Sequence, residues 1–398
     1  MPMPYLPNPL PVHGQPLDPG DAETLGLAAA GRVAQVLALR DGNAATPLHA
    51  LPGLARALGI GALHVKDEGF RLGLGSFKAL GGAYALMILV REEAERRLGR
   101  PVAIDELMSA AVRAIAATMT FACATDGNHG RSVAQGAQLM GARAVIFVHS
   151  GVSEARIGAI AGFGARIVRV PGNYDDSVAE AARVAGAEGW TVLSDTSWPG
   201  YEYIPGLVSQ GYIALVREVL DELPEPPSHV FLQAGVGGFA AAVAGHLSLV
   251  LGDHRPHVTV VEPARAACLY ESARAGRPVK IAEGEPTVMA MLECYAPSLV
   301  GFRILSRVAD GFMVVAEDTA REVMRRLATP VEGDPAIVAG ESGGAGLAGL
   351  LTALREPALV ARIGLGPNAR VLVVNTEGAT DPALYALITG RSPEAVLA

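Results

Sequence analysis

The chain has 398 residues, of which 50% are hydrophobic and 18% charged, and its formal net charge at pH 7 is -8. This length allows two domains, and the apolar fraction is large enough to fill their cores. Nucleic acids and anionic membranes bind through clustered Lys and Arg, and the sequence has no basic run, so we expect neither as a partner. The composition is typical of a soluble α/β enzyme.

The chain opens with a proline-rich segment, residues 1–11. It lacks the basic end and unbroken apolar run of a signal peptide, so we expect an extended arm there. Residues 22–39 follow with apolar side chains at helical spacing, which predicts an amphipathic helix. Residues 63–66 predict a strand that leads into a glycine-rich loop.

Lys78 ends that loop and stands at the start of an apolar, helix-like run, residues 79–90. Its flanking residues are Phe77, Ala79 and Leu80 rather than charged ones. A lysine in apolar surroundings loses part of its preference for the ammonium form, which frees a neutral amine to act as nucleophile and base. We therefore predict an imine-forming lysine. The alternative is an ordinary lysine whose ammonium group reaches water.

From residue 104 to residue 195 short apolar runs alternate with helical segments. The predicted strands are 118–123, 144–148, 166–170 and 191–193, and the predicted helices are 131–140, 153–162 and 174–187. Further predicted strands follow at 229–232, 258–261, 312–315 and 370–374. Strands and helices in turn imply right-handed crossovers, so we predict an α/β fold with mostly parallel, twisted sheets flanked by helices.

The first strand of this block runs into Thr125-Asp-Gly-Asn-His129, just before a helix. A loop between strand and helix presents free N–H groups at the positive end of a helix dipole, which suits a carboxylate. The alternative is a turn in which Asp, Gly and Asn serve only the backbone.

A second loop, Gly235-Val-Gly-Gly238, also follows a strand and precedes a helix, so its amides can surround a phosphate. It lacks the Gly-Lys-Ser/Thr of a nucleoside-triphosphate loop. A dinucleotide site is the rival, with Glu262 as the ribose-binding acid, although the glycine spacing misses G-x-G-x-x-G. The apolar run 234–251 approaches membrane length, but its glycines and His246 favour a buried helix.

Together with these loops, the run Gly75-Ser-Phe-Lys-Ala-Leu-Gly-Gly82 resembles the cofactor-lysine segment of the fold-type II pyridoxal 5'-phosphate enzymes. The resemblance implies pyridoxal phosphate as cofactor, a homodimer, a large cofactor-binding domain of residues 1–94 and 196–398, and a small inserted α/β domain of residues 95–195. The implied cofactor-binding residues are Phe77, Lys78, Asn128, Gly235, Val236, Gly237, Gly238, Glu341 and Thr376, and the implied substrate-binding residues are Thr125, Asp126, Gly127, Asn128 and His129.

The resemblance also implies roles for single residues. Asn128 would contact the phenolic oxygen of the cofactor, and Thr376 would face the pyridine nitrogen, where a neutral hydroxyl leaves that nitrogen largely unprotonated. Glu341 would lie near the ring, although its segment could also be a plain helix-opening turn.

Within that family, Lys66-Asp-Glu-x-x-Arg71 and Thr125-Asp-Gly-Asn-His-Gly130 are similar to the diaminopropionate ammonia-lyases. That likeness implies α,β-elimination of ammonia from 2,3-diaminopropionate, which gives pyruvate and ammonia. Lys78 would then take the Cα proton of an L-substrate and Asp126 that of a D-substrate. Asp195 would be a second catalytic or substrate-binding carboxylate, unless it only caps a turn.

One stretch departs from the lyase pattern, because Met291 and Tyr295 stand where two glycines are usual. A different or bulkier β-substituted amino acid therefore stays open as the substrate. The alternatives are a serine/threonine-type dehydratase, an NAD-binding oxidoreductase, and a catalytically silent protein that binds a small ligand.

The three cysteines are Cys123, Cys268 and Cys294, with no C-x-x-C pair and no histidine spacing suited to zinc. We therefore predict no metal site. The cysteines read as thiols of a cytoplasmic protein, with a disulfide between Cys268 and Cys294 as the minor alternative.

Overall fold

The computed structural model describes residues 4–125, 127–331 and 333–398. The chain divides into two compact units. The first unit comprises residues 1–26, 45–71 and 215–398, and the second unit comprises residues 27–44 and 72–214. The predicted α/β class is confirmed, since each unit is built on a mostly parallel sheet. The domain division implied by the resemblance stays a prediction.

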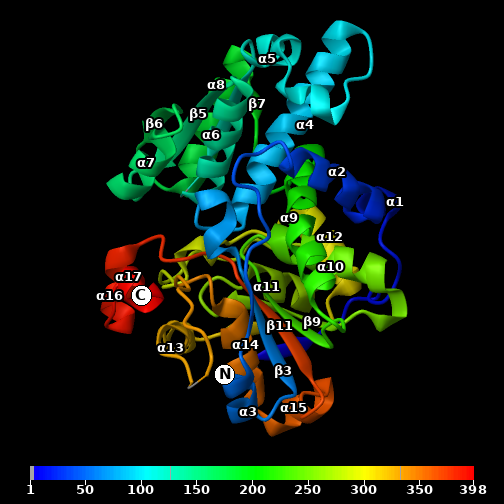
Figure 1. Ribbon diagram of the computed structural model, residues 1–398, viewed down its shortest axis with the longest axis vertical. Coiled ribbons are helices and arrows are strands. Elements are labelled where there is room, and N and C mark those ends of the chain that lie inside the picture. Colours follow the sequence, from blue (N-terminus) through cyan, green and yellow to red (C-terminus); the bar gives the residue numbers. More distant parts are fainter. Residues whose placement is uncertain (1–3, 126, 332) are drawn as a thin grey trace. The chain divides into compact units, whose positions relative to one another are not determined.

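The first unit contains a seven-stranded sheet in the order β1-β10-β9-β8-β11-β3-β2. Its strands are β1 (Tyr5–Pro7), β2 (Leu48–Ala50), β3 (Ala62–Asp67), β8 (His229–Gln233), β9 (His257–Pro263), β10 (Gly311–Val315) and β11 (Arg370–Asn375). The five inner strands are parallel and the two edge strands antiparallel, with β3 and β11 side by side (Figure 1). The carboxyl ends of β8 and β11 therefore meet at one edge of the sheet.

The inner strands are apolar along their length because helices cover the sheet. The helices of this unit are α1 (Pro19–Leu25), α3 (Pro52–Leu58), α10 (Gly238–Leu251), α11 (Cys268–Ala275), α12 (Leu299–Val308), α13 (Glu317–Ala328), α14 (Ala345–Leu354), α15 (Pro357–Ile363), α16 (Pro382–Thr389) and α17 (Pro393–Leu397). Helix α14 packs against four inner strands. Two glycines allow this approach, since a Cβ at Gly346 would lie 2.5 Å from the Phe231 carbonyl and one at Gly349 2.5 Å from Val261.

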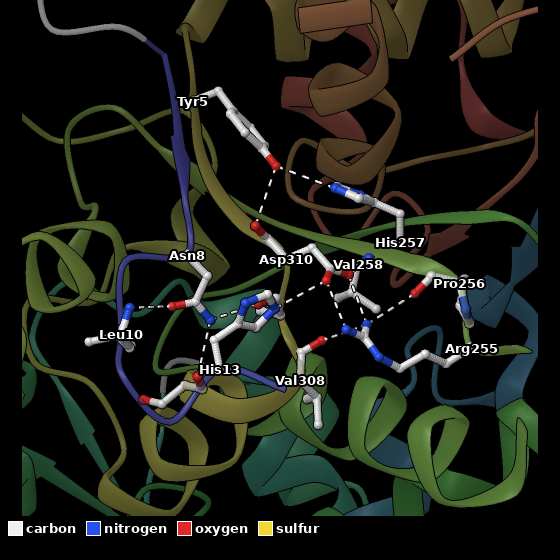
Figure 2. A network of polar contacts seen from close by, with 12 residues as sticks. Tyr5, Asn8, Leu10, His13, Arg255, Pro256, His257, Val258, Val308 and Asp310 are labelled. Atoms are coloured by element: carbon white, nitrogen blue, oxygen red, sulfur yellow. Dashed lines mark hydrogen bonds and ion pairs between the residues drawn. The ribbon is translucent and has the colours of Figure 1, made fainter. Parts of the chain in front are cut away.

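The expected N-terminal arm forms β1, which pairs with β10, and its anchor is Asp310 (Figure 2). The Asp310 carboxylate accepts two bonds from Arg255, both 2.8 Å, and contacts His13 Nε2 at 3.1 Å. Asn8 Nδ2 donates to the carbonyl of Ala309 at 2.7 Å. The arm is thus held where β10 begins.

The prediction of one continuous helix over residues 22–39 was wrong. The chain forms α1 and then α2 (Leu27–Leu37), because Gly26 takes an extended conformation (φ -78°, ψ 179°). The run 234–251 does contain a buried helix, α10. Within the ranges described, no helix is long and apolar enough to cross a membrane.

The second unit has a four-stranded parallel sheet in the order β6-β5-β4-β7. Its elements are β4 (Thr120–Ala124), β5 (Arg143–His149), β6 (Arg166–Val170), β7 (Thr191–Val192), α4 (Lys78–Leu98), α5 (Ala110–Ala116), α6 (Asn128–Met140), α7 (Glu154–Ala161) and α8 (Tyr174–Glu188). Helix α9 (Tyr203–Glu222) runs from the second unit into the first. The predicted strands and helices of this block are confirmed to within a few residues.

Helices α4 and α6 pack closely in the second unit. A Cβ at Gly136 would lie 2.8 Å from the Ala83 Cα, and one at Gly82 would lie 2.9 Å from Ser132 Oγ. Small residues thus fix α4, which begins at Lys78, against α6, which begins at Asn128.

Candidate active site

Lys78 is the first residue of α4, and its amine donates a hydrogen bond to the Asp195 carboxylate. Both side chains are partly buried, 24% and 14% exposed. The structure therefore brings together two of the three predicted catalytic residues, 117 positions apart. The Lys78 amine thus has a carboxylate neighbour that its apolar flanks in the sequence did not indicate.

The charge of Lys78 also acts on its surroundings. Burial alone would raise the pKa of Asp195, but the charge and hydrogen bond of Lys78, together with His129 and a backbone hydrogen bond, outweigh burial and hold that pKa well below its ordinary value. Tyr212 of α9 is 2% exposed and lies edge-on to Phe77, with 4.8 Å between ring centroids. Burial raises the pKa of Tyr212, and the charges of Lys78 and Asp195 both act on it. Tyr212 is a site residue that sequence reasoning missed.

The predicted substrate loop closes around Thr125. Its Oγ1 accepts hydrogen bonds from the backbone N–H groups of Gly127 (3.0 Å) and Gly130 (3.1 Å). Asn128 and His129 then form the first turn of α6, and both are buried. Asp126 lies outside the described residues, so its predicted role as a base stays a prediction.

His129 links this loop to the segment before Asp195. Its Nε2 lies 3.1 Å from the Leu193 carbonyl, which can only accept, so Nε2 carries the hydrogen. Its Nδ1 is buried and has no partner among the residues that the structure describes. Burial lowers the pKa of His129, so the ring is neutral at pH 7 and Nδ1 has an available lone pair.

In the first unit, the loop Gly235–Gly238 joins the carboxyl end of β8 to α10. Gly237 caps the helix with φ +99°, a conformation that favours glycine. Over the described ranges, no hydrogen bond to another residue uses the amides of Gly235, Val236, Gly237 or Gly238. Free N–H groups at a helix N-terminus fit a phosphate group. The loop therefore suits the phosphate of pyridoxal phosphate.

Two cysteines lie against this loop. A Cβ at Gly235 would lie 2.8 Å from Cys294 Sγ, and Cys268 Sγ contacts the Gly235 carbonyl at 3.6 Å. No disulfide joins them among the described residues, in agreement with the main prediction. They restrict the space around Gly235, so that position requires a small residue.

Glu262 does not have the setting that a dinucleotide site needs. Its two carboxylate oxygens accept hydrogen bonds from the backbone N–H groups of Leu269 (2.8 Å) and Tyr270 (2.7 Å), at the start of α11. Burial raises the pKa of Glu262 to about 8. The side chain therefore caps a helix in place of a ribose contact.

Thr376 directly follows β11 and is 3% exposed. Its Oγ1 accepts a hydrogen bond from Gln233 Nε2 at 2.9 Å, and its backbone N–H donates to the Gly343 carbonyl at 3.2 Å. Glu341 is 1% exposed and lies two residues before Gly343, in the loop that leads to α14. Because β8 and β11 are parallel neighbours, Thr376 and the glycine loop lie at the same edge of the sheet.

The segment that departs from the lyase pattern also lies in the first unit. The Met291 N–H donates to Ser342 Oγ at 3.1 Å, next to Glu341. The Tyr295 hydroxyl donates to Glu293 at 2.7 Å. With Cys294 against Gly235, the unusual residues border the predicted cofactor groups of this unit.

The residues Lys66, Glu68 and Arg71 of the lyase-like motif form a buried charge cluster with Glu218. Arg71 contacts Glu68 and Glu218, each at 2.7 Å, and Lys66 contacts Glu218 at 2.7 Å. All four charges are therefore paired inside the first unit. This part of the motif stabilises the fold.

The predicted site residues thus form two groups. The second unit holds the Lys78–Asp195 pair and the first turn of α6, and the first unit holds the glycine loop with Thr376 and Glu341. Sequence reasoning missed Tyr212 and Gln233. Tyr212 lies in a long apolar helix without a local motif, whereas Gln233, at a strand end two residues before a glycine loop, could have been noticed.

The chain is similar to known proteins in sequence and in structure. The family model for "Pyridoxal-phosphate dependent enzyme" matches residues 39–378. Diaminopropionate ammonia-lyase from Escherichia coli (strain K12) is 39% identical over 358 residues, 88% of each chain. The crystal structure of the Escherichia coli enzyme with D-serine has a TM-score of 0.86 and 36% identity, and covers 97% of this chain and 96% of that one. Its structure with an aminoacrylate-PLP azomethine intermediate has a TM-score of 0.84 and 35% identity, with the same coverage. The chain belongs to the pyridoxal-phosphate-dependent enzyme family.

Proposed function

We propose that the chain catalyses the α,β-elimination of ammonia from 2,3-diaminopropionate with pyridoxal phosphate as cofactor. With one water molecule, the reaction gives pyruvate and two molecules of ammonia. The observation that carries the proposal is the Lys78–Asp195 ion pair, whose two charges also act on His129 in the first turn of α6. The solved relative with an aminoacrylate-PLP azomethine intermediate supports the same chemistry.

The chain's own residues have distinct tasks. When bound, the cofactor supplies an electron sink for the electrons released at the substrate Cα. Lys78 holds the cofactor through its amine and takes the Cα proton of an L-substrate, and Asp126 takes that of a D-substrate. Asp195 accepts a hydrogen bond from Lys78 and so holds the amine in place.

Substrate and cofactor charges meet donors at two helix N-termini. The amides of the α6 first turn, with Thr125 and Asn128, bind the substrate carboxylate and the cofactor oxygen. The amides of Gly235–Gly238 bind the cofactor phosphate, and Thr376 with Glu341 lies beside the ring. A homodimer in the cytoplasm completes the proposal; the assembly rests on the family resemblance and the location on the absence of disulfides among the described cysteines.

A dehydratase acting on serine or threonine is the second candidate. The observation that favours it is the altered segment around Met291 and Tyr295, which lies near Glu341 and the glycine loop. Bulkier side chains there would change the shape of the space beside the cofactor. The two candidates differ in the leaving group, so they can be separated by substrate.

The lysine composition allows a direct test, because the sequence has only three lysines: Lys66, Lys78 and Lys280. Lys66 is fully buried in the charge cluster, and Lys280 is exposed. Borohydride reduction of the holoenzyme followed by peptide mass spectrometry should find the cofactor on Lys78. Lys78→Ala should remove the visible cofactor absorbance, and the control Lys280→Ala should retain it.

Pyruvate release then identifies the substrate. We expect faster release from 2,3-diaminopropionate than from serine or threonine. Label on Lys280, or no cofactor binding, would refute the family mechanism, whereas preference for serine would leave the cofactor assignment intact and support the dehydratase.

A further inference from the structure

Gln233 is the last residue of β8, and its side chain is inserted between β8, β11 and the loop before α14. It is 2% exposed. Its Nε2 atom lies 2.7 Å from the Gly343 carbonyl, 2.9 Å from the Val374 carbonyl and 2.9 Å from Thr376 Oγ1.

The surroundings fix which way the amide points. Two of its three neighbours are backbone carbonyls, which only accept, so the atom facing them must be the nitrogen and not the oxygen. The amide nitrogen has no lone pair available for a hydrogen bond. The nitrogen therefore shares its two hydrogens among three acceptors, one of which is Thr376 Oγ1. Because the nitrogen cannot accept, the Thr376 hydroxyl hydrogen points away from Gln233.

The amide position itself is tightly constrained. A Cβ at Gly346 would lie 3.0 Å from Gln233 Oε1 and 2.5 Å from the Phe231 carbonyl. The glycine at the start of α14 thus leaves just enough space for the side chain. Rotation of the nitrogen away from Thr376 would also break its hydrogen bonds to the Gly343 and Val374 carbonyls, so the contacts of the nitrogen hold the amide in place.

We propose that Gln233 is a positioning residue that makes the Thr376 hydroxyl a hydrogen-bond donor toward the cofactor ring nitrogen. This inference rests on the proposed function, in which Thr376 faces that nitrogen. A hydroxyl that donates requires an acceptor, and the unprotonated ring nitrogen is one, whereas a protonated nitrogen is itself a donor. Gln233 therefore selects the unprotonated ring, although it does not touch the cofactor.

The test uses the holoenzyme with cofactor that is isotopically labelled at its ring nitrogen, and reads the NMR resonance of that nitrogen. The wild type should show an unprotonated nitrogen at pH 7, and a protonated one would overturn the inference without any variant. Gln233→Met, close in size but without N–H donors, should move the resonance toward the protonated form. It should also weaken cofactor binding about fivefold, the usual effect of one lost hydrogen bond.

The same substitution in a Thr376 variant distinguishes a positioning role of Gln233 from a general loss of structure. In Thr376→Val the change Gln233→Met should no longer move the resonance, because the hydroxyl through which it acts is absent. An equal shift in both backgrounds would overturn the inference. Should Gln233→Met fail to fold, Thr376→Ser must keep the wild-type resonance and Thr376→Val must change it. Borohydride labelling of Lys78 is scored in each sample, so failure of the proposed function is seen separately.

Discussion

Replacing Arg71 with methionine should destabilise the first unit by about 3–5 kcal/mol, the usual result of breaking a buried ion pair by removing one partner. The Arg71 and Glu68 side chains are 0% exposed, and that of Glu218 is 19% exposed. Methionine fills most of the same volume, but it leaves two carboxylates without the guanidinium that contacts each at 2.7 Å. Glu218 keeps Lys66 at 2.7 Å, so the loss comes mainly from the buried Glu68 carboxylate, whose ion pair with Arg71 is removed.

Urea unfolding followed by circular dichroism at pH 7 measures this loss. The matched control is Arg96→Met on α4, whose arginine is 70% exposed and should matter little. Burial would raise the pKa of Glu218, but its contacts with Arg71 and Lys66 together outweigh burial and lower it. The wild type therefore loses this contribution as the pH falls through that lowered pKa, while protonation in acid removes the unfavourable buried charge of Glu68 in the variant. The difference in unfolding free energy between wild type and Arg71→Met should thus become smaller in acid. A loss as small as that of the control, or one independent of pH, would refute the reasoning.

Three further outcomes are expected. Asp195→Asn should lower kcat/KM for 2,3-diaminopropionate by about 100-fold, because Lys78 loses its charged partner; pyruvate release measures it, and a loss below about threefold would contradict the role. Asp126→Asn should reduce turnover of the D-isomer more than the L-isomer, and equal losses would speak against two bases. Asp310→Asn should release the N-terminal arm to limited proteolysis at pH 7, because His13 of the arm loses its carboxylate contact at 3.1 Å and Arg255 no longer holds that carboxylate in place. Burial would raise the pKa of Asp310, but its contacts with Arg255 help to lower it. The proteolysis rates of wild type and variant should therefore become similar in acid, where Asp310 is protonated. An arm that stays protected in the variant at pH 7 would refute this prediction.

Most inner strands were predictable from sequence because they contain short apolar runs, whereas the three-residue edge strands β1 and β2 were not predicted. Runs such as 229–232 and 370–374 differ from β8 and β11 by one residue at the carboxyl end. The break between α1 and α2 was not predictable by periodicity, since apolar spacing continues through Gly26. The backbone conformation of one residue, at a point where the chain passes between units, ends the first helix.

Local motifs located the loops of the site, but they could not show its long-range pairs. The flanks of Lys78 are apolar, yet Asp195 lies beside it because α4 and the end of β7 meet in the second unit. Gln233 and Thr376 are 143 positions apart and meet only because β8 and β11 are neighbours in the sheet. Both pairs depend on strand order and register, which no window of sequence contains.

These pairs also separate two kinds of motif residue. Glu68 and Glu218, ion-pair partners of Lys66 and Arg71, lie inside the first unit, so these motif residues have a structural role there. His129 Nδ1, by contrast, is buried without a partner among the described residues, and the amides of Gly235–Gly238 donate to none of them. Buried polar groups without a partner reduce stability, and a bound ligand that supplies the partner removes that cost. The two sets of substitutions should therefore have independent effects. Arg71→Met should lower the stability with or without cofactor, whereas the effects of the Lys78 and Gln233 substitutions should be seen only in the presence of the cofactor.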